Sequence, residues 1–157
     1  MSVPHPSEGR PLPEHGPCFV CGHSNPHSLG VTWFVLPDGR ITTTLTFTQA
    51  QQGPPGFAHG GASAAVLDEA MGASVWSAGH TVVAVNLNVD YLRPVPLGAE
   101  VQVLAWIAGR DGRALHTQAE LRLPDGRVAV RARGIYVEAP HLFDEEAVRA
   151  WLGGSET

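Results

Sequence analysis

The sequence predicts an α+β domain in which a mostly antiparallel β-sheet wraps around one long central α-helix. Two segments of strand-like alternation precede a single long helical segment, and four more follow it. Short turns rich in Gly and Pro join the later strands, which implies antiparallel hairpins. The helical segment is too apolar to lie exposed, so we expect the sheet to curl around it.

The first two strands are expected to form a β-hairpin. Residues 31–36 (VTWFVL) and 40–47 (RITTTLTF) flank Pro37-Asp38-Gly39, a strong turn signal. Residues 48–56 (TQAQQGPPG) have loop composition and separate the hairpin from the helical segment, which we expect to end near Gly79.

The strand after the helix is expected at residues 82–91, with one buried face. Its sequence, VVAVNLNVDY, alternates with a period of two residues, which is typical of a half-buried strand. The residues of the expected buried face are Val83, Val85, Leu87, Val89 and Tyr91.

Three further strands complete the predicted sheet, at residues 100–108, 114–123 and 127–137. Turns are expected at residues 109–112 (GRDG) and 124–126 (PDG). The strands at 82–91 and 100–108 should each present a long, regular edge. Because such edges are normally covered or paired, we expect the chain to dimerise.

The ends of the chain differ in composition from its middle. Residues 1–17 carry five prolines among polar residues and predict an irregular arm. Residues 18–140 form the predicted domain. Residues 141–157 should form a short helix, at 144–152 (DEEAVRAWL), and a tail.

Composition and charge exclude several classes of function. The 157 residues suit one domain, and a net charge of −5 offers no basic face for nucleic acid. Charged residues make up 16%, below the usual ~25%, which favours a surface partly covered by another subunit. Apolar runs are too short to span a membrane, the N-terminus does not resemble a secretory signal, and two cysteines make no disulfide framework. We therefore expect a cytoplasmic protein with neither a membrane nor a nucleic-acid partner.

Cys18 and Cys21 form a single CxxC pair. One interpretation is half a zinc site, and another is a redox pair. The candidate histidines to complete a zinc site are His5, His15, His23 and His27. A structural zinc site usually needs a second ligand cluster, and a redox pair should open a helix, whereas turn residues follow here. We therefore expect the pair to be structural or inert, and we expect no metal.

The helical segment carries the residues suited to chemistry. In GFAHGGASAAVLDEAMG (56–72), Gly60 and Gly61 lie at the helix start, where free N–H groups can bind an anion or an oxyanion. Asp68 and Glu69 then interrupt an apolar run, and a carboxylate there is costly unless it is exposed or used. Asp68 shares a face with Gly61, so we favour it over Glu69, which could be a surface acid.

The spacing of these groups indicates a site shared between two chains. Gly61 and Asp68 are seven residues apart, so they lie about 10 Å apart along a helix axis. That is too far for both to act on one carbonyl, but an antiparallel partner helix would bring its own Asp68 closer. Ser63 is not in the Gly-x-Ser-x-Gly setting of α/β-hydrolases.

In this order of elements, the sequence resembles the hotdog-fold thioesterases of the phenylacetate-type acyl-CoA thioesterase family. The residues that carry the resemblance are His59-Gly60-Gly61, Asp68 nine positions after His59, LNVDYLRPVPLG at 87–98 and CFVCGHSNPHSLG at 18–30. The resemblance extends from Cys18 to Val137, nearly the whole domain.

The resemblance implies hydrolysis of an acyl-CoA thioester to a free acid and CoA, without a cofactor, in a dimer or dimer of dimers with interfacial active sites. Gly60 matches the glycine whose N–H polarises the thioester carbonyl. Asp68 matches the carboxylate that attacks the carbonyl or activates water. His59 matches the histidine that opens the motif, although a structural capping role is equally open. Gln52, seven residues before His59, matches an amide found in many members, and Gln51 is a neighbouring candidate.

Substrate-binding residues are expected around this segment. Arg93 could pair with CoA phosphates. An acyl pocket is expected from Phe57, Met71 and Trp76, together with Val75. Other interpretations are a non-catalytic CoA-ester binding protein, a hotdog hydratase or dehydratase and a zinc protein.

Overall fold

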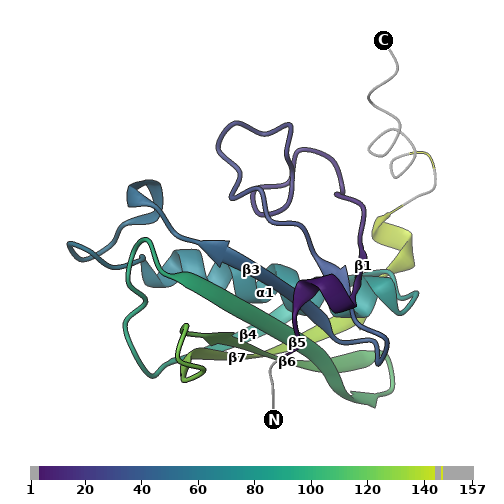
Figure 1. Ribbon diagram of the computed structural model, residues 1–157. Coiled ribbons are helices and arrows are strands. Elements are labelled where there is room, and N and C mark those ends of the chain that lie inside the picture. Colours follow the sequence, from purple (N-terminus) through teal and green to yellow (C-terminus); the bar gives the residue numbers. More distant parts are fainter. Residues whose placement is uncertain (1–3, 144–145, 147–157) are drawn as a thin grey trace.

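The computed structural model describes residues 4–143 and residue 146, and it contains one long α-helix lying against one β-sheet (Figure 1). The described elements, in chain order, are η1 (Pro6–Glu8), β1 (Arg10–Pro11), β2 (Phe34–Val35), β3 (Ile41–Thr46), η2 (Gln49–Gln51), α1 (Gly60–Ser77), β4 (Val82–Tyr91), β5 (Glu100–Asp111), β6 (Ala114–Arg122), β7 (Val128–Glu138) and η3 (Pro140–Leu142). No helix of the described part is long and apolar enough to cross a membrane.

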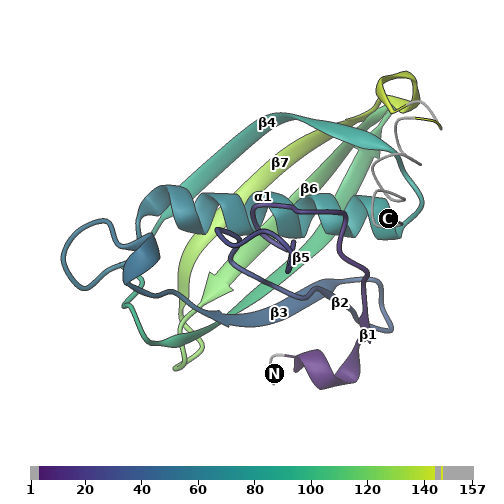
Figure 2. The same ribbon diagram turned by 90° about the horizontal axis from the view of Figure 1, so that it is seen from above.

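All seven strands of the described residues belong to one sheet, in the order β1-β2-β3-β5-β6-β7-β4. Every neighbouring pair is antiparallel. Figure 2 shows α1 crossing one face of the sheet, with β3 and β4 on either side of it. The predicted α+β fold, a sheet wrapped around one central helix, is confirmed.

The core lies between α1 and the sheet. Five apolar side chains of α1 are fully buried: Val66, Leu67, Ala70, Met71 and Val75. They pack with buried strand residues that include Ile41, Val103 and Leu121. Apolar residues occupy the circumference of α1 almost evenly, so a second layer is needed to cover the side away from the sheet.

Residues 12–33, between β1 and β2, supply that second layer, and residues 4–33 are called the N-terminal arm from here on. Within residues 1–17, where an irregular arm was predicted, η1 forms and β1 pairs with β2. The segment between β1 and β2 crosses α1 on the side away from the sheet (Figures 1 and 2). Val20 and Cys21, both buried, join the core from this segment. The helix predicted at residues 144–152 lies outside the described residues except for Glu146.

The predicted hairpin at residues 31–47 is confirmed, with β2 paired to β3. The predicted turn at residues 109–112 is too long. β5 continues to Asp111, and the turn needs only Gly112, at φ +58°, and Arg113. A bulge in the pairing between Ile107 and Gly109 absorbs the extra residue.

Two predictions about the strand faces and edges were wrong. β5 lies between β3 and β6, so only β4 of the two proposed strands forms an edge. A bulge between Ala84 and Asn86 breaks the alternation of β4, so Ala84 pairs with Tyr136 while Leu87 pairs with Gly134. The face that carries Leu87 and Tyr91 is not buried, because these side chains are 41% and 55% exposed at the edge.

Packing of Phe47 provides a test of this core. Phe47 follows β3 in the chain, and its side chain is fully buried in the hydrophobic core. Phe47→Ala should lower the free energy of unfolding by about 3–5 kcal/mol, because it removes buried apolar surface and leaves a cavity. Urea unfolding followed by circular dichroism would measure the change. Phe19→Ala is the control, since Phe19 is 58% exposed and its loss should cost less than about 0.5 kcal/mol. Equal effects of the two substitutions would contradict this core.

Candidate active site at the start and middle of the central helix

His59 caps the start of α1. Its Nδ1 accepts a hydrogen bond from the N–H of Gly61 at 2.8 Å, and its carbonyl accepts from Ala62 at 2.9 Å. His59 was predicted either to open the catalytic motif or to cap the helix, and this geometry shows the capping role. Among the described residues, no acceptor takes up the N–H of Gly60. The helix start therefore offers one N–H group, that of Gly60, to a ligand.

Tyr91 fixes the position of Gly60 from β4. Its hydroxyl donates to the carbonyl of Gly60 at 2.7 Å. A Cβ atom built on Gly60 would lie 3.1 Å from the tyrosine hydroxyl and ring, so the close approach suits glycine. Sequence reasoning placed Tyr91 on a buried strand face and missed this contact.

Asp68 is held by Tyr136 from β7. The Tyr136 hydroxyl donates to the carboxylate Oδ1 of Asp68 at 2.6 Å and lies 2.8 Å from its carbonyl oxygen. Burial, reinforced by the adjacent Asp68 carboxylate, raises the pKa of Tyr136, so the phenol remains a donor at neutral pH. The half-buried Asp68 carboxylate thus has one oxygen oriented by a hydrogen bond.

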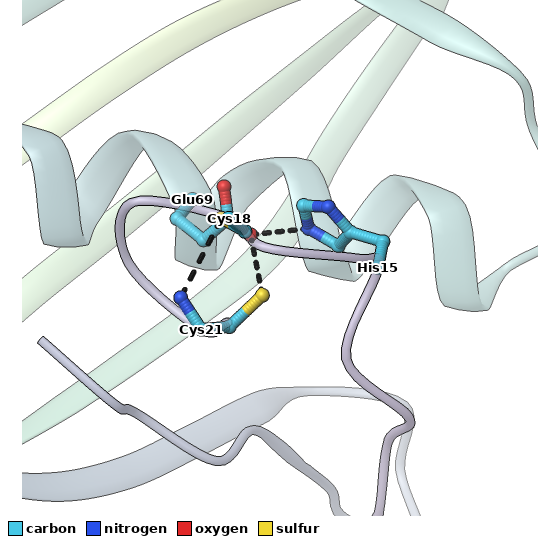
Figure 3. A group of neighbouring side chains, drawn as sticks. All are labelled: His15, Cys18, Cys21 and Glu69. Carbon is cyan, nitrogen blue, oxygen red and sulfur yellow. Dashed lines mark hydrogen bonds and ion pairs between the residues drawn. The ribbon is translucent and has the colours of Figure 1, made fainter. Parts of the chain in front are cut away.

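Glu69 has entirely different surroundings, and its interpretation as a surface acid was wrong. The N-terminal arm covers it, and its side chain is only 19% exposed. One carboxylate oxygen lies 3.5 Å from Cys18 Sγ, 3.3 Å from Cys21 Sγ and in hydrogen-bond contact with His15 Nε2 (Figure 3). Burial would raise the pKa of Glu69, but the hydrogen bond and charge of His15, with the two thiols, hold it below its usual value.

The expectation that Cys18 and Cys21 are structural or inert, without a metal, depended on the absence of a second ligand cluster. The structure brings His15 and Glu69 to the pair, so that reason no longer applies. His15 was among the histidines considered from the sequence. Glu69, 48 residues after Cys21, had no sequence signal, because only the crossing of the arm over α1 joins them.

Gln52 lies in a loop that closes on itself before α1. Gln52 pairs with Ala58 in an isolated bridge, and its side-chain oxygen accepts from the N–H of Gly56 at 3.1 Å. The carbonyl of Gln51 accepts the His59 N–H at 2.7 Å. Gln52 is exposed and close in the chain to the helix start, which is where the sequence placed it.

The predicted substrate-binding residues do not gather within one chain. Phe57 precedes the start of α1 and Trp76 lies near its end, about 24 Å further along the axis at 1.5 Å per residue. Trp76 is 41% exposed and packs edge-to-face on Phe143. Met71 is fully buried in the core. The exposed Arg93 donates to the carbonyl of Val128 at 2.7 Å.

With this geometry in place, comparisons with known proteins show what this chain is similar to. The family model described as Thioesterase superfamily matches residues 55–130, the part of the chain that holds α1 and β4 to β6. The acyl-coenzyme A thioesterase THEM4 of Xenopus laevis is 35% identical over 92 residues, which are 59% of this chain and 39% of the relative. The chain therefore spans about two fifths of the length of that curated relative.

Solved structures show the same fold. A crystal structure of a thioesterase superfamily protein aligns with a TM-score of 0.75 and 35% identity, covering 79% of this chain and 60% of that one. The PaaI protein of the E. coli phenylacetic acid degradation operon aligns with a TM-score of 0.66 and 22% identity, covering 71% and 80%. The predicted hotdog fold is thereby confirmed, and over residues 55–130 the chain is similar to the thioesterase superfamily.

Proposed function

We propose that this chain is an acyl-CoA thioesterase that hydrolyses an acyl-CoA thioester to a free acid and CoA. The observation that carries the proposal is that α1 presents two functional groups. One is the available N–H of Gly60, and the other is the Asp68 carboxylate, which Tyr136 orients. The substrate class is taken from the relative named as an acyl-coenzyme A thioesterase.

Asp68 supplies the nucleophile in one of two ways. Its carboxylate attacks the thioester carbonyl, expels the CoA thiolate and forms an anhydride, which water then hydrolyses. Alternatively, it takes a proton from a water molecule that attacks the same carbonyl. Both routes consume one water and yield the acid and CoA. Glu69 is a poorer candidate, because its carboxylate is engaged by His15 and the two cysteines.

Gly60 supplies the donor for the oxyanion. A preorganised donor of this kind contributes about 3 kcal/mol to transition-state stabilisation. Gly61 is less suited to donate, because its N–H is taken up by His59. The role of His59 is then to fix the helix start so that the Gly60 N–H, and not that of Gly61, faces the substrate. Gln52 lies in the adjacent loop, where it can add a polar contact.

We propose a dimer in which each site combines Gly60 of one chain with Asp68 of the partner subunit. Within one chain the two residues are about 12 Å apart along the helix axis. β4 is a ten-residue edge strand with Val85, Leu87 and Tyr91 exposed, and such an edge favours pairing with a second chain. Pairing there would join the two sheets and bring the helices together, and two such dimers could form a tetramer.

Substrate contacts follow from this arrangement. The exposed guanidinium of Arg93, at the end of β4, is proposed to pair with a phosphate of CoA. Phe57 and Trp76, which are partly exposed, are proposed as acyl-pocket residues contributed across the two subunits, whereas Met71 is fully buried in the core and is no longer proposed. A cytoplasmic location is proposed because Cys18 and Cys21 are free thiols.

Replacing Asp68 tests the proposed chemistry. Asp68→Asn and Asp68→Ala should each lower kcat/KM for acyl-CoA by at least about 100-fold, because they remove the nucleophile or general base. Hydrolysis of a panel of aromatic, short-chain and medium-chain acyl-CoAs would measure the effect. Asp38→Asn is the matched control, since Asp38 is an exposed carboxylate in the turn between β2 and β3, away from the edge strand β4. Activity retained in both Asp68 variants would refute its role, and thermal stabilisation by acyl-CoA without turnover would indicate a binding protein.

Mixed dimers test whether the site is shared. Gly60→Pro deletes the proposed donor, and proline is tolerated at the first position of a helix. His59 already has the extended conformation that a following proline requires. Gly60→Ala adds a Cβ but keeps the N–H, so it controls for contact with Tyr91.

Gly60→Pro and Asp68→Asn homodimers should both be inactive, whereas refolding the two chains together in equal amounts should restore about a quarter of wild-type activity. The reason is that about half of the dimers are then mixed, and each mixed dimer has one intact site. Activity is measured after subunit exchange. The reference mixture combines Gly60→Ala chains with Asp68→Asn chains. No recovery in an exchanged mixture would place the site within one chain.

Replacing Tyr136 separates orientation of Asp68 from chemistry. Tyr136→Phe should lower the free energy of unfolding by about 1.5–3 kcal/mol, the usual worth of a hydrogen bond to a charged group. It should also reduce kcat with little change in KM, because Asp68 remains present but less well oriented. Tyr91→Phe, at an exposed tyrosine, is the stability control and should cost less than about 1 kcal/mol. An unchanged stability and kcat in Tyr136→Phe would contradict the positioning role.

A further inference from the structure

Four side chains with metal-binding atoms converge where the N-terminal arm crosses α1. His15, Cys18 and Cys21 come from the arm, and Glu69 comes from the middle of the helix (Figure 3). One ligand atom from each lies within 4.8 Å of all the others. The proposed hydrolysis does not use any of them.

The distances suit a small tetrahedral ion. Ligands held about 2.0–2.3 Å from a tetrahedral Zn²⁺ lie about 3.3–3.8 Å from one another. Cys21 Sγ and Cys18 Sγ lie 3.3 and 3.5 Å from the same oxygen of Glu69. His15 Nε2 contacts that oxygen directly, so a small outward movement of the imidazole and carboxylate would open the centre of the cluster.

The backbone of the CxxC turn is arranged to support a metal-bound sulfur. The N–H groups of Val20 and Cys21 point at Cys18 Sγ at 3.3 and 3.5 Å. Such donors orient a ligating thiolate and stabilise its charge. The Gly22 N–H donates to the Cys18 carbonyl at 2.9 Å, and a Cβ on Gly22 would lie 2.2 Å from the Cys18 nitrogen. The turn therefore requires glycine after Cys21 and holds both sulfurs on the helix side.

Burial of the cluster also favours an ion. Cys21 is 2% exposed and the Glu69 side chain 19% exposed, so a carboxylate and a thiol are both withdrawn from water. A buried carboxylate is costly unless it is paired or coordinates a metal. His15 already pairs with it, but a divalent cation would engage all four groups at once.

We propose that His15, Cys18, Cys21 and Glu69 bind one Zn²⁺ per chain and so fasten the N-terminal arm to α1. Two thiolates and an imidazole select zinc over calcium or magnesium, which prefer oxygen ligands. Four protein ligands make the site closed, as in structural zinc sites. Binding releases the thiol protons of Cys18 and Cys21, and no redox step is involved.

Metal content of the purified full-length chain tests the site. Protein expressed without an affinity tag in zinc-supplemented medium should contain about one zinc per chain by elemental analysis. Cobalt substitution should give the intense visible bands of a tetrahedral site and thiolate-to-cobalt charge transfer in the near ultraviolet. Less than about half an equivalent of zinc, with no cobalt spectrum after metal-free reconstitution, would overturn the proposal.

Ligand variants locate the metal. Cys18→Ser, Cys21→Ser and Glu69→Gln should each weaken zinc binding by more than about 100-fold in a chelator competition, since outer hydrogen-bond partners alone are worth 10–100-fold. The matched control is His27→Asn, an exposed histidine of the same arm, which should bind zinc as the wild type does. Unchanged zinc affinity in all three ligand variants would place the metal elsewhere and refute the site.

Thermal unfolding distinguishes a metal clamp from a hydrogen-bonded cluster. Removing zinc with a chelator should lower the Tm of the wild type, and adding zinc back should restore it. The Cys18→Ser/Cys21→Ser double variant should show no response to either treatment. A wild-type Tm that is indifferent to chelator and to added zinc would show that the four side chains form only a hydrogen-bonded cluster.

Discussion

The rest of the structure depends on the burial of one helix that is apolar on nearly all sides. A sheet covers only one side of α1, where Val66, Leu67 and Met71 enter the core. The opposite side requires a second layer, and the arm between β1 and β2 provides it with Val20 and Cys21. Burial of α1 therefore dictates where the strands curl, why the arm crosses the helix and which helical residues remain accessible.

Accessible positions on α1 are those that the sheet and the arm leave partly uncovered. Gly60 and Asp68 are such positions, and each is fixed by a tyrosine from a strand rather than by another helical residue. Tyr91 and Tyr136 come from β4 and β7, which pair with each other at the open edge of the sheet. The proposed catalytic groups are thus held by the same strands whose edge is available to a second chain.

The sequence was sufficient for the order of elements and for the position of the helix start, because both are local. Alternation predicts β4 at the residues observed, and His59-Gly60-Gly61 predicts the capped helix start. The sequence was insufficient where a single residue changes the geometry. The bulge at Val85 shifts the faces of β4, and no residue type marks the position of this bulge. Contacts between distant segments, such as Tyr136 with Asp68 or His15 with Glu69, depend on packing that periodicity does not encode.

The adjacent carboxylates show how a small rotation on a helix can separate two functions. Asp68 and Glu69 differ by about 100° around the axis, so one faces the strands and the other faces the arm. The strand side leaves Asp68 half-buried and held by one phenol, which suits a group that must react. The arm side surrounds Glu69 with an imidazole and two thiols, which suits a group that must hold a cation. An arm fastened at Glu69 would also limit movement of the helical turn that carries Asp68, so a structural metal and a reactive carboxylate can share one turn without sharing a ligand.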